Sequence, residues 1–127
     1  MKYGFDVHGV IDTYPTVFAA MMRALVAAGH EVHVITGPSQ TPEFEKDLEA
    51  HGVVYTHFCS IIDYCHAKGI AVTYDGRGNG WVRAEAWDSA KGEYCALNGI
   101  HLHIDDSDEY HKWFQTPYLK MMKRGTK

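Results

Sequence analysis

The first 36 residues constrain the fold most, because they contain the pattern of a strand–helix–strand unit. Residues 3–7 form a short apolar run, and from 16 to 28 apolar residues recur every three or four positions, which is helical spacing. Gly29 follows the last periodic residue, and the β-branched run 31–35 comes next. Two strands joined by a crossover helix lie parallel, so this segment predicts the start of a mostly parallel α/β sheet.

The rest of the chain continues this alternation of strands and helices. We expect helices at 42–50, 60–67 and 89–97, a helical turn near 109–114, strands at 53–56, 100–104 and 118–121, and a hairpin of 70–74 and 81–84 around the glycine-rich turn 75–80. A chain of 127 residues has room for one domain, which we place at 1–127. The predicted fold is a Rossmann-like three-layer α/β/α sandwich.

Charge and composition exclude several classes of protein. Twelve Lys and Arg against sixteen Asp and Glu leave a formal net charge of −4, which argues against a broad nucleic-acid-binding surface. The apolar stretches are too short to span a bilayer, so we expect no membrane partner. The three cysteines form no CxxC pair and the chain opens on no signal sequence, which together favour the cytoplasm. Self-association into a homo-oligomer stays open.

Polar residues gather at the predicted carboxyl ends of the strands, where open α/β sheets bind their ligands. Three strand ends and one helix contribute Asp6 and His8, Thr36 and Gly37, Asp105 and Asp106, and Lys91. Carboxylates from two strand ends can hold Mg²⁺, while a lysine and a hydroxyl can neutralise and orient a phosphate. The set therefore predicts a magnesium-dependent phosphate site.

The order of these motifs resembles the haloacid-dehalogenase-like (HAD-like) hydrolase superfamily. The similarity lies in Asp6-Val7-His8-Gly9-Val10-Ile11, Val34-Ile35-Thr36-Gly37, Lys91 and Ile104-Asp105-Asp106-Ser107, and covers residues 3 to about 108. It implies a phosphohydrolase in which Asp6 attacks a phosphate monoester, carried by a small molecule or a macromolecule, and forms an aspartyl-phosphate.

The same resemblance implies the roles of the other residues. Thr36, the backbone N–H groups at Gly37, and Lys91 would bind the phosphoryl oxygens. The Mg²⁺ ligands would be Asp6, the backbone carbonyl of His8, and Asp106, with Asp105 as a further ligand or as a neighbour that supports them. The implied catalytic set is Asp6, His8, Thr36 and Lys91.

His8 is the main departure from the family pattern. Phosphatases of the superfamily usually carry a second aspartate at this position, and it acts as general acid and base. An imidazole titrates near neutral pH and could take that role. The resemblance thus favours a phosphohydrolase and leaves open a non-catalytic phosphate- or nucleotide-binding module. The short segment between Gly9 and Thr16 leaves almost no room for a cap domain, so we expect a minimal cap or none.

The nine histidines form no recognisable metal motif. No spacing among them and the three cysteines matches a structural zinc site. We therefore expect His33 and His103, which lie in or beside predicted strands, to be packing or surface groups.

Overall fold

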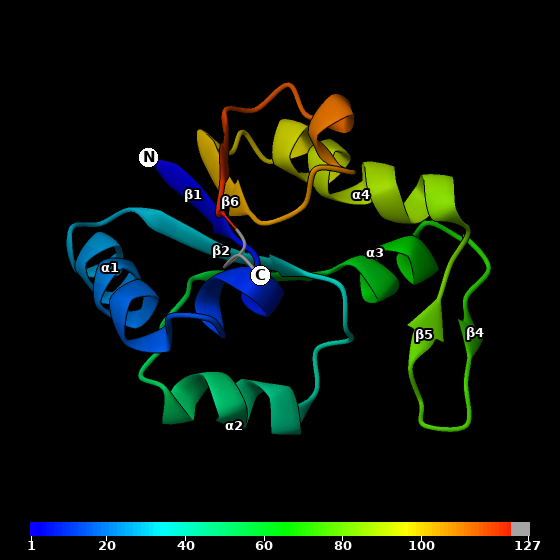
Figure 1. Cartoon of the computed structure of the whole chain (residues 1–127), viewed down its shortest axis with the longest axis horizontal. Coiled ribbons are helices and arrows are strands. Elements are labelled where there is room, and N and C mark those ends of the chain that lie inside the picture. The colour runs from blue at the N-terminus through cyan, green and yellow to red at the C-terminus, as the bar shows by residue number, and fades with distance from the viewer. Residues whose placement is uncertain (123–127) are drawn as a thin grey trace, which may run out of the picture.

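The computed structural model describes residues 1–122, and five parallel strands form its central sheet (Figure 1). The strands are β1 (Lys2–Phe5), β2 (Glu31–Thr36), β3 (His57–Ser60), β6 (Leu102–Asp105) and β7 (Tyr118–Lys120). They lie in the order β3-β2-β1-β6-β7, and each neighbouring pair is parallel. The predicted α/β class and parallel sheet are confirmed.

Helices pack against both faces of this sheet (Figure 1). They are α1 (Pro15–Ala27), α2 (Pro42–Ala50), α3 (Ile61–Ala67), α4 (Ala84–Leu97) and a 3₁₀ turn η2 (His111–Trp113), together with a short turn η1 (Val7–Ile11) in which His8 and Gly9 have non-helical backbone angles. Successive side chains of a strand point to opposite faces. Accordingly, Val34 of β2 packs in one cluster with Phe18 of α1, whereas Ile35 packs in another with Cys95 of α4. Within residues 1–122, no helix is both long and apolar enough to cross a membrane.

Some element boundaries differ from the prediction. The third strand is β3 at His57–Ser60, while 53–56 carries the chain from α2 to the sheet edge. Val53 supplied the strand-like apolar signal, but it is buried beside α1 and α2 as part of that connection. The hairpin strands β4 (Thr73–Tyr74) and β5 (Gly80–Trp81) are shorter than expected, because the helix α4 already begins at Ala84. The Ala-Glu-Ala sequence there favours a helix.

The strand order reverses at β1, and this reversal positions the candidate site. The chain runs from β1 through β2 to β3 at one edge, and then returns to place β6 on the other side of β1. The backbone N–H of Asp6 donates to the carbonyl of Ile104 at 3.0 Å, which holds the two carboxyl ends together. Ligands of open α/β sheets bind at such a reversal.

Candidate functional site

Asp6 lies at the carboxyl end of β1, immediately before η1. Its carboxylate accepts a hydrogen bond from the backbone N–H of Val7 at 2.9 Å, and the residue is only 6% exposed. Burial raises the pKa of Asp6 to about 7, since the Lys91 ammonium offsets the cost of burial only in part and the Asp105 carboxylate adds to it. The positive charge of Lys91 is therefore too small to keep the pKa of Asp6 at its usual value.

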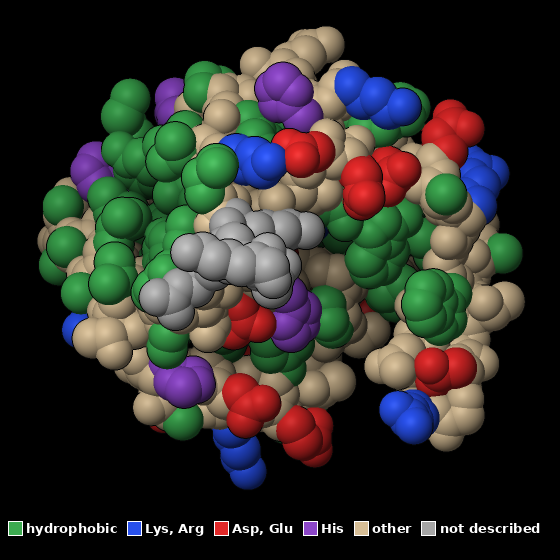
Figure 2. All heavy atoms as spheres, in the orientation of Figure 1, with side chains coloured by type: hydrophobic (Ala, Val, Ile, Leu, Met, Phe, Trp, Pro, Cys, Tyr) green, Lys and Arg blue, Asp and Glu red, His purple; other side chains and the backbone are tan. Residues whose placement is uncertain are grey.

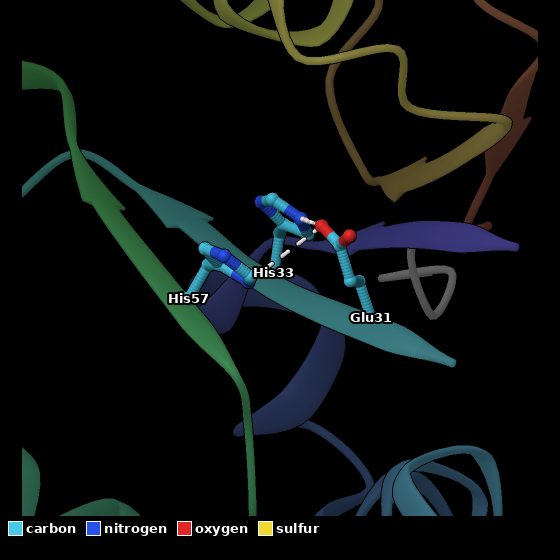
Figure 3. A group of neighbouring side chains, drawn as sticks. All are labelled: Glu31, His33 and His57. Carbon is cyan, nitrogen blue, oxygen red and sulfur yellow. Dashed lines mark hydrogen bonds and ion pairs between the residues drawn. The ribbon is translucent and has the colours of Figure 1, made fainter. Parts of the chain in front are cut away.

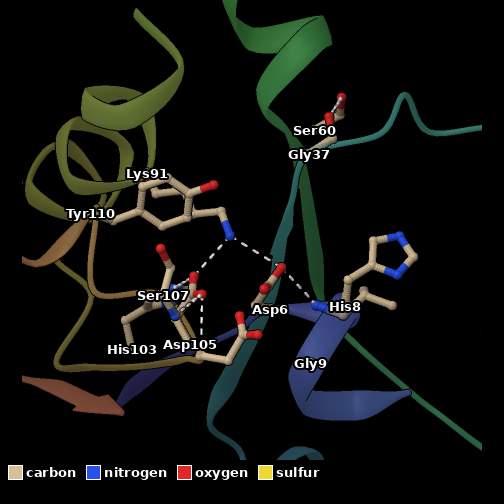
Figure 4. A network of polar contacts seen from close by, with 12 residues as sticks. Asp6, His8, Gly9, Gly37, Ser60, Lys91, His103, Asp105, Ser107 and Tyr110 are labelled. Carbon is tan, nitrogen blue, oxygen red and sulfur yellow. Dashed lines mark hydrogen bonds and ion pairs between the residues drawn. The ribbon is translucent and has the colours of Figure 1, made fainter. Parts of the chain in front are cut away.

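Lys91 joins the two buried acids of the site. It lies on α4, is 2% exposed, and places its Nζ 3.1 Å from Asp6 Oδ1 and 2.8 Å from Asp105 Oδ2 (Figure 4). The ammonium also lies 4.9 Å from the centre of the Tyr110 ring. Burial alone would lower the pKa of Lys91, but the two carboxylates outweigh it and raise the pKa. The lysine is therefore a charged bridge between the ends of β1 and β6.

Asp105 is held by four donors. Its Oδ2 accepts from Lys91 and from Nε2 of His103 at 2.9 Å, and its Oδ1 accepts from the backbone N–H groups of Asp106 at 2.8 Å and Ser107 at 3.3 Å. Burial alone would raise the pKa of Asp105, but the His103 hydrogen bond and the Lys91 charge lower it well below its usual range. With both oxygens engaged, this carboxylate is suited to orient Lys91.

Asp106 packs directly against the backbone of Gly9. Gly9 has a φ of 86°, and a Cβ at this position would clash with the Asp106 carboxylate. Asp6, Asp105 and Asp106 each offer one oxygen, and these atoms lie within 4.8 Å of one another. Carboxylate oxygens are typical ligands for a hard divalent cation, so these three residues fit an ion such as Mg²⁺. Asp6 and Asp106 are the better placed ligands, because Asp105 is already saturated with hydrogen bonds.

Thr36 contributes a buried hydroxyl at the carboxyl end of β2. The residue is fully buried, and within residues 1–122 its Oγ1 has no hydrogen-bond partner. An unpaired buried hydroxyl costs about 1–3 kcal/mol, which a bound acceptor would recover. The next residue, Gly37, has no room for a side chain, because a Cβ would lie 2.5 Å from the Trp87 ring. This strand end therefore offers a hydroxyl donor to a ligand.

The side chain of His8 does not face the other predicted site residues. Figure 4 shows its ring pointing away from Asp6. Its Nδ1 lies 3.0 Å from the Asp12 carboxylate, and the ring stacks on Phe44 with 6.2 Å between ring centres. The structure thus brings Asp6, Lys91 and the two later aspartates together, and leaves the His8 imidazole outside this group.

An open pocket of about 620 Å³ lies beside Gly37. It lies between the β4–β5 hairpin and the segment that follows β2, and the same face is visibly hollowed there in Figure 2. Three of its lining residues are aromatic, namely Phe44, Trp81 and Trp87. A ligand at the strand ends could therefore extend over an apolar surface.

Two residues of the site were not among the predicted ones. His103 is fully buried, stacks on Phe114 and bonds to Asp105. The sequence holds a signal for it, because residues two apart on a strand share a face, and His103 precedes Asp105 by two. Tyr110, whose hydroxyl accepts from Trp87 Nε1 at 2.7 Å, covers the Lys91 ammonium.

Comparison with known proteins assigns no family to this chain. No family model, curated protein or solved structure matches it. The chemistry of the strand ends is therefore the basis for a functional assignment.

Proposed function

We propose that this protein is a magnesium-dependent phosphohydrolase of the HAD-like superfamily, with Asp6 as its nucleophile. The fold would be the three-layer α/β/α sandwich of that superfamily, with the β4–β5 hairpin as a minimal cap. The observation that carries the proposal is the buried Lys91 ammonium, 3.1 Å from Asp6, with the Asp106 carboxylate in the same cluster. A nucleophilic carboxylate, a charge that positions it and a cation ligand thus meet at the strand reversal.

The reaction would proceed in two displacements. One oxygen of Asp6 attacks phosphorus, the bond to the leaving oxygen breaks, and an aspartyl-phosphate forms. Water then attacks this phosphorus, which releases inorganic phosphate and restores the Asp6 carboxylate. When bound, Mg²⁺ supplies positive charge that offsets the repulsion between carboxylate and phosphate. Lys91 holds the attacking carboxylate, and the Thr36 hydroxyl donates to a phosphoryl oxygen.

The proposed substrate is a phosphate monoester whose leaving group lies in the pocket beside Gly37. Phe44, Trp81 and Trp87 line this pocket, so an aromatic leaving group would contact apolar surface there. p-Nitrophenyl phosphate is therefore a suitable first probe. Its leaving group also departs without a proton, so the first displacement does not depend on an acid at position 8, whereas the attack of water in the second can still use a base there.

A second candidate function is that of a phosphate-binding module without turnover. The orientation of His8 favours this binding module, because the imidazole is hydrogen-bonded to Asp12 and points away from Asp6. No acid or base on this turn then faces the nucleophile. In this case the same residues would bind Mg²⁺ and phosphate but would not complete the reaction.

We further assign the protein to a reducing compartment such as the cytoplasm. Cys59, Cys65 and Cys95 are all free thiols and all buried. Burial raises the pKa of Cys59 to about 12, which keeps this thiol protonated. Buried, protonated thiols are typical of packing groups in a reducing environment.

Turnover of p-nitrophenyl phosphate, with and without Mg²⁺, tests the proposal. The native protein should be active only with the metal, and Asp6→Asn should abolish this activity. Asp47→Asn, which changes an exposed carboxylate of α2, is the matched control and should behave as the native protein. Full activity of Asp6→Asn would refute the phosphohydrolase.

The two candidate functions differ in what His8→Asp does. If the native protein binds inorganic phosphate with Mg²⁺ in calorimetry but turns over nothing, the binding module is correct. His8→Asp should then introduce turnover, because it restores a carboxyl group at the acid–base position. If the native protein binds neither the metal nor phosphate, both candidates fail.

A further inference from the structure

A second cluster of metal-ligating side chains lies at the opposite ends of β2 and β3. Glu31 is the first residue of β2 and His57 the first of β3, whereas the phosphate-site residues follow the strands. Glu31 and His33 are two apart on one strand, so their side chains share a face. His33 and His57 are register partners on neighbouring strands, which places the two imidazoles side by side (Figure 3).

The ligand atoms of this cluster are already close. His33 Nε2 lies 2.9 Å from Glu31 Oε1, and His57 Nδ1 lies 3.8 Å from the same oxygen. Two ligands bound to one tetrahedral ion at 2.0–2.1 Å are about 3.3–3.4 Å apart. The existing separations fall on either side of that spacing, so the distances from both imidazoles to Glu31 are already close to those of a coordinated ion.

We propose that Glu31, His33 and His57 bind a transition-metal ion of the Zn²⁺ class, independently of the phosphate site. Two imidazole nitrogens and one carboxylate oxygen are typical ligands for such ions, whereas Mg²⁺ prefers oxygen alone. Three protein ligands leave a further position open to water. Because β3 is an edge strand, the ion would tie this strand to its neighbour β2.

The surroundings of His33 suit it to act as a metal ligand. The residue is 1% exposed, and its Nδ1 lies 2.8 Å from the hydroxyl of Tyr94 on α4. Burial lowers the pKa of His33, so the imidazole is neutral as a metal ligand must be. With an ion on Nε2, the Nδ1–H would donate to Tyr94, as the second nitrogen of a metal-bound histidine usually does.

One ring must turn when the ion binds. The His33 and His57 rings are stacked, with 4.2 Å between centres and 6° between planes. The lone pairs of parallel rings do not converge, so one ring has to rotate. His57 is the mobile partner, because its side chain is 49% exposed, whereas His33 is buried. The ion would also displace the Thr56 contact to His57 and compete with Lys2, whose Nζ lies 3.8 Å from Glu31.

Titration with Co²⁺ tests this site, because tetrahedral or five-coordinate Co²⁺ has a visible absorption that solvated Co²⁺ lacks. The titration is made in excess Mg²⁺ on the native protein, Glu31→Gln and His57→Ala, each checked for native circular dichroism. His51→Ala, which removes an exposed histidine at the end of α2, is the matched control. Asp106→Asn removes a carboxylate of the phosphate site.

The proposal predicts one Co²⁺ per chain with a strong visible band, displaced by one equivalent of Zn²⁺. Glu31→Gln and His57→Ala should lose the band, while His51→Ala and Asp106→Asn should keep it. Tyr94→Phe should weaken binding by on the order of 10–100-fold through loss of the contact that orients His33. An unchanged band in His57→Ala, or no band in the native protein, would overturn the proposal.

Discussion

Replacing Asp6 with asparagine should remove a pH dependence from the stability of the magnesium-free protein. Asparagine keeps the shape of the side chain and can still accept from Val7 and Lys91, but it cannot ionise. The native carboxyl group, by contrast, ionises inside the fold as the pH rises through about 7. A comparison of the two proteins therefore isolates the cost of that buried charge.

The structure gives the sign and size of the effect. The pKa of Asp6 is 3.8 in an unfolded chain and about 7 in the fold, so the folded state binds this proton more tightly. The resulting stability is fully present below pH 3.8 and is lost as the pH rises through about 7. Between about pH 5 and about pH 8, the loss from this one group is about 2–3 kcal/mol.

Other groups titrate in the same range, but they cancel in the comparison. Burial lowers the pKa of His33 and His103, so their contribution has the opposite sign: it is present above pH 6.5 and is lost as the pH falls from there through their lower pKa in the fold. Both histidines are present in the native protein and in Asp6→Asn. The difference between the two proteins therefore reports Asp6.

Urea unfolding with EDTA present, followed by circular dichroism at both pH values, measures the effect. The native protein should lose about 2–3 kcal/mol more than Asp6→Asn on going from the acidic to the alkaline buffer. Saturating Mg²⁺ should remove this extra loss, since the ion favours the charged carboxylate. An equal change in the free energy of unfolding for the two proteins would refute the reasoning.

Three further substitutions test the site. Lys91→Met leaves two buried carboxylates without their cation, so it should lower the free energy of unfolding in urea by about 3–5 kcal/mol and abolish turnover. An unchanged urea midpoint would contradict the buried ion pairs of Lys91 with Asp6 and Asp105. Thr36→Val removes an unpaired hydroxyl and should raise stability by about 1 kcal/mol while weakening phosphate binding in calorimetry. Gly9→Ala should lower Mg²⁺ affinity by displacing Asp106, whereas Gly29→Ala, with the same positive φ but open space around it, should not. Equal Mg²⁺ affinities for both variants would argue against this contact.

The sequence predicts the fold best where local patterns are strong. The apolar spacing of α1, the β-branched run of β2 and the glycine between them specify the first strand–helix–strand unit. It predicts β3 poorly, because strand boundaries depend on pairing with β2. His57–Ser60 carries no alternating pattern of its own, and the apolar Val53 packs in a connection instead.

Some features of the candidate site can likewise be predicted from the sequence, and others cannot. Residues that follow strands, such as Asp6 and Asp106, can be found from the sequence because the carboxyl ends of parallel strands share one edge. The direction in which a side chain points cannot be found in this way. The His8 imidazole therefore points away from Asp6, although its place in the sequence suggested that it belongs to the site. The pairing of His33 with His57 depends on the register of two strands, which no local spacing encodes.

The most direct test of the central claim is to locate the phosphoryl group during turnover. The native protein is mixed with p-nitrophenyl phosphate and Mg²⁺, quenched with acid during the p-nitrophenol burst, and mapped by peptide mass spectrometry. The proposal predicts one phosphoryl group on the peptide that contains Asp6, and none on that peptide in Asp6→Asn. A burst accompanied by a phosphoryl group on another residue, or by none at all, would contradict it.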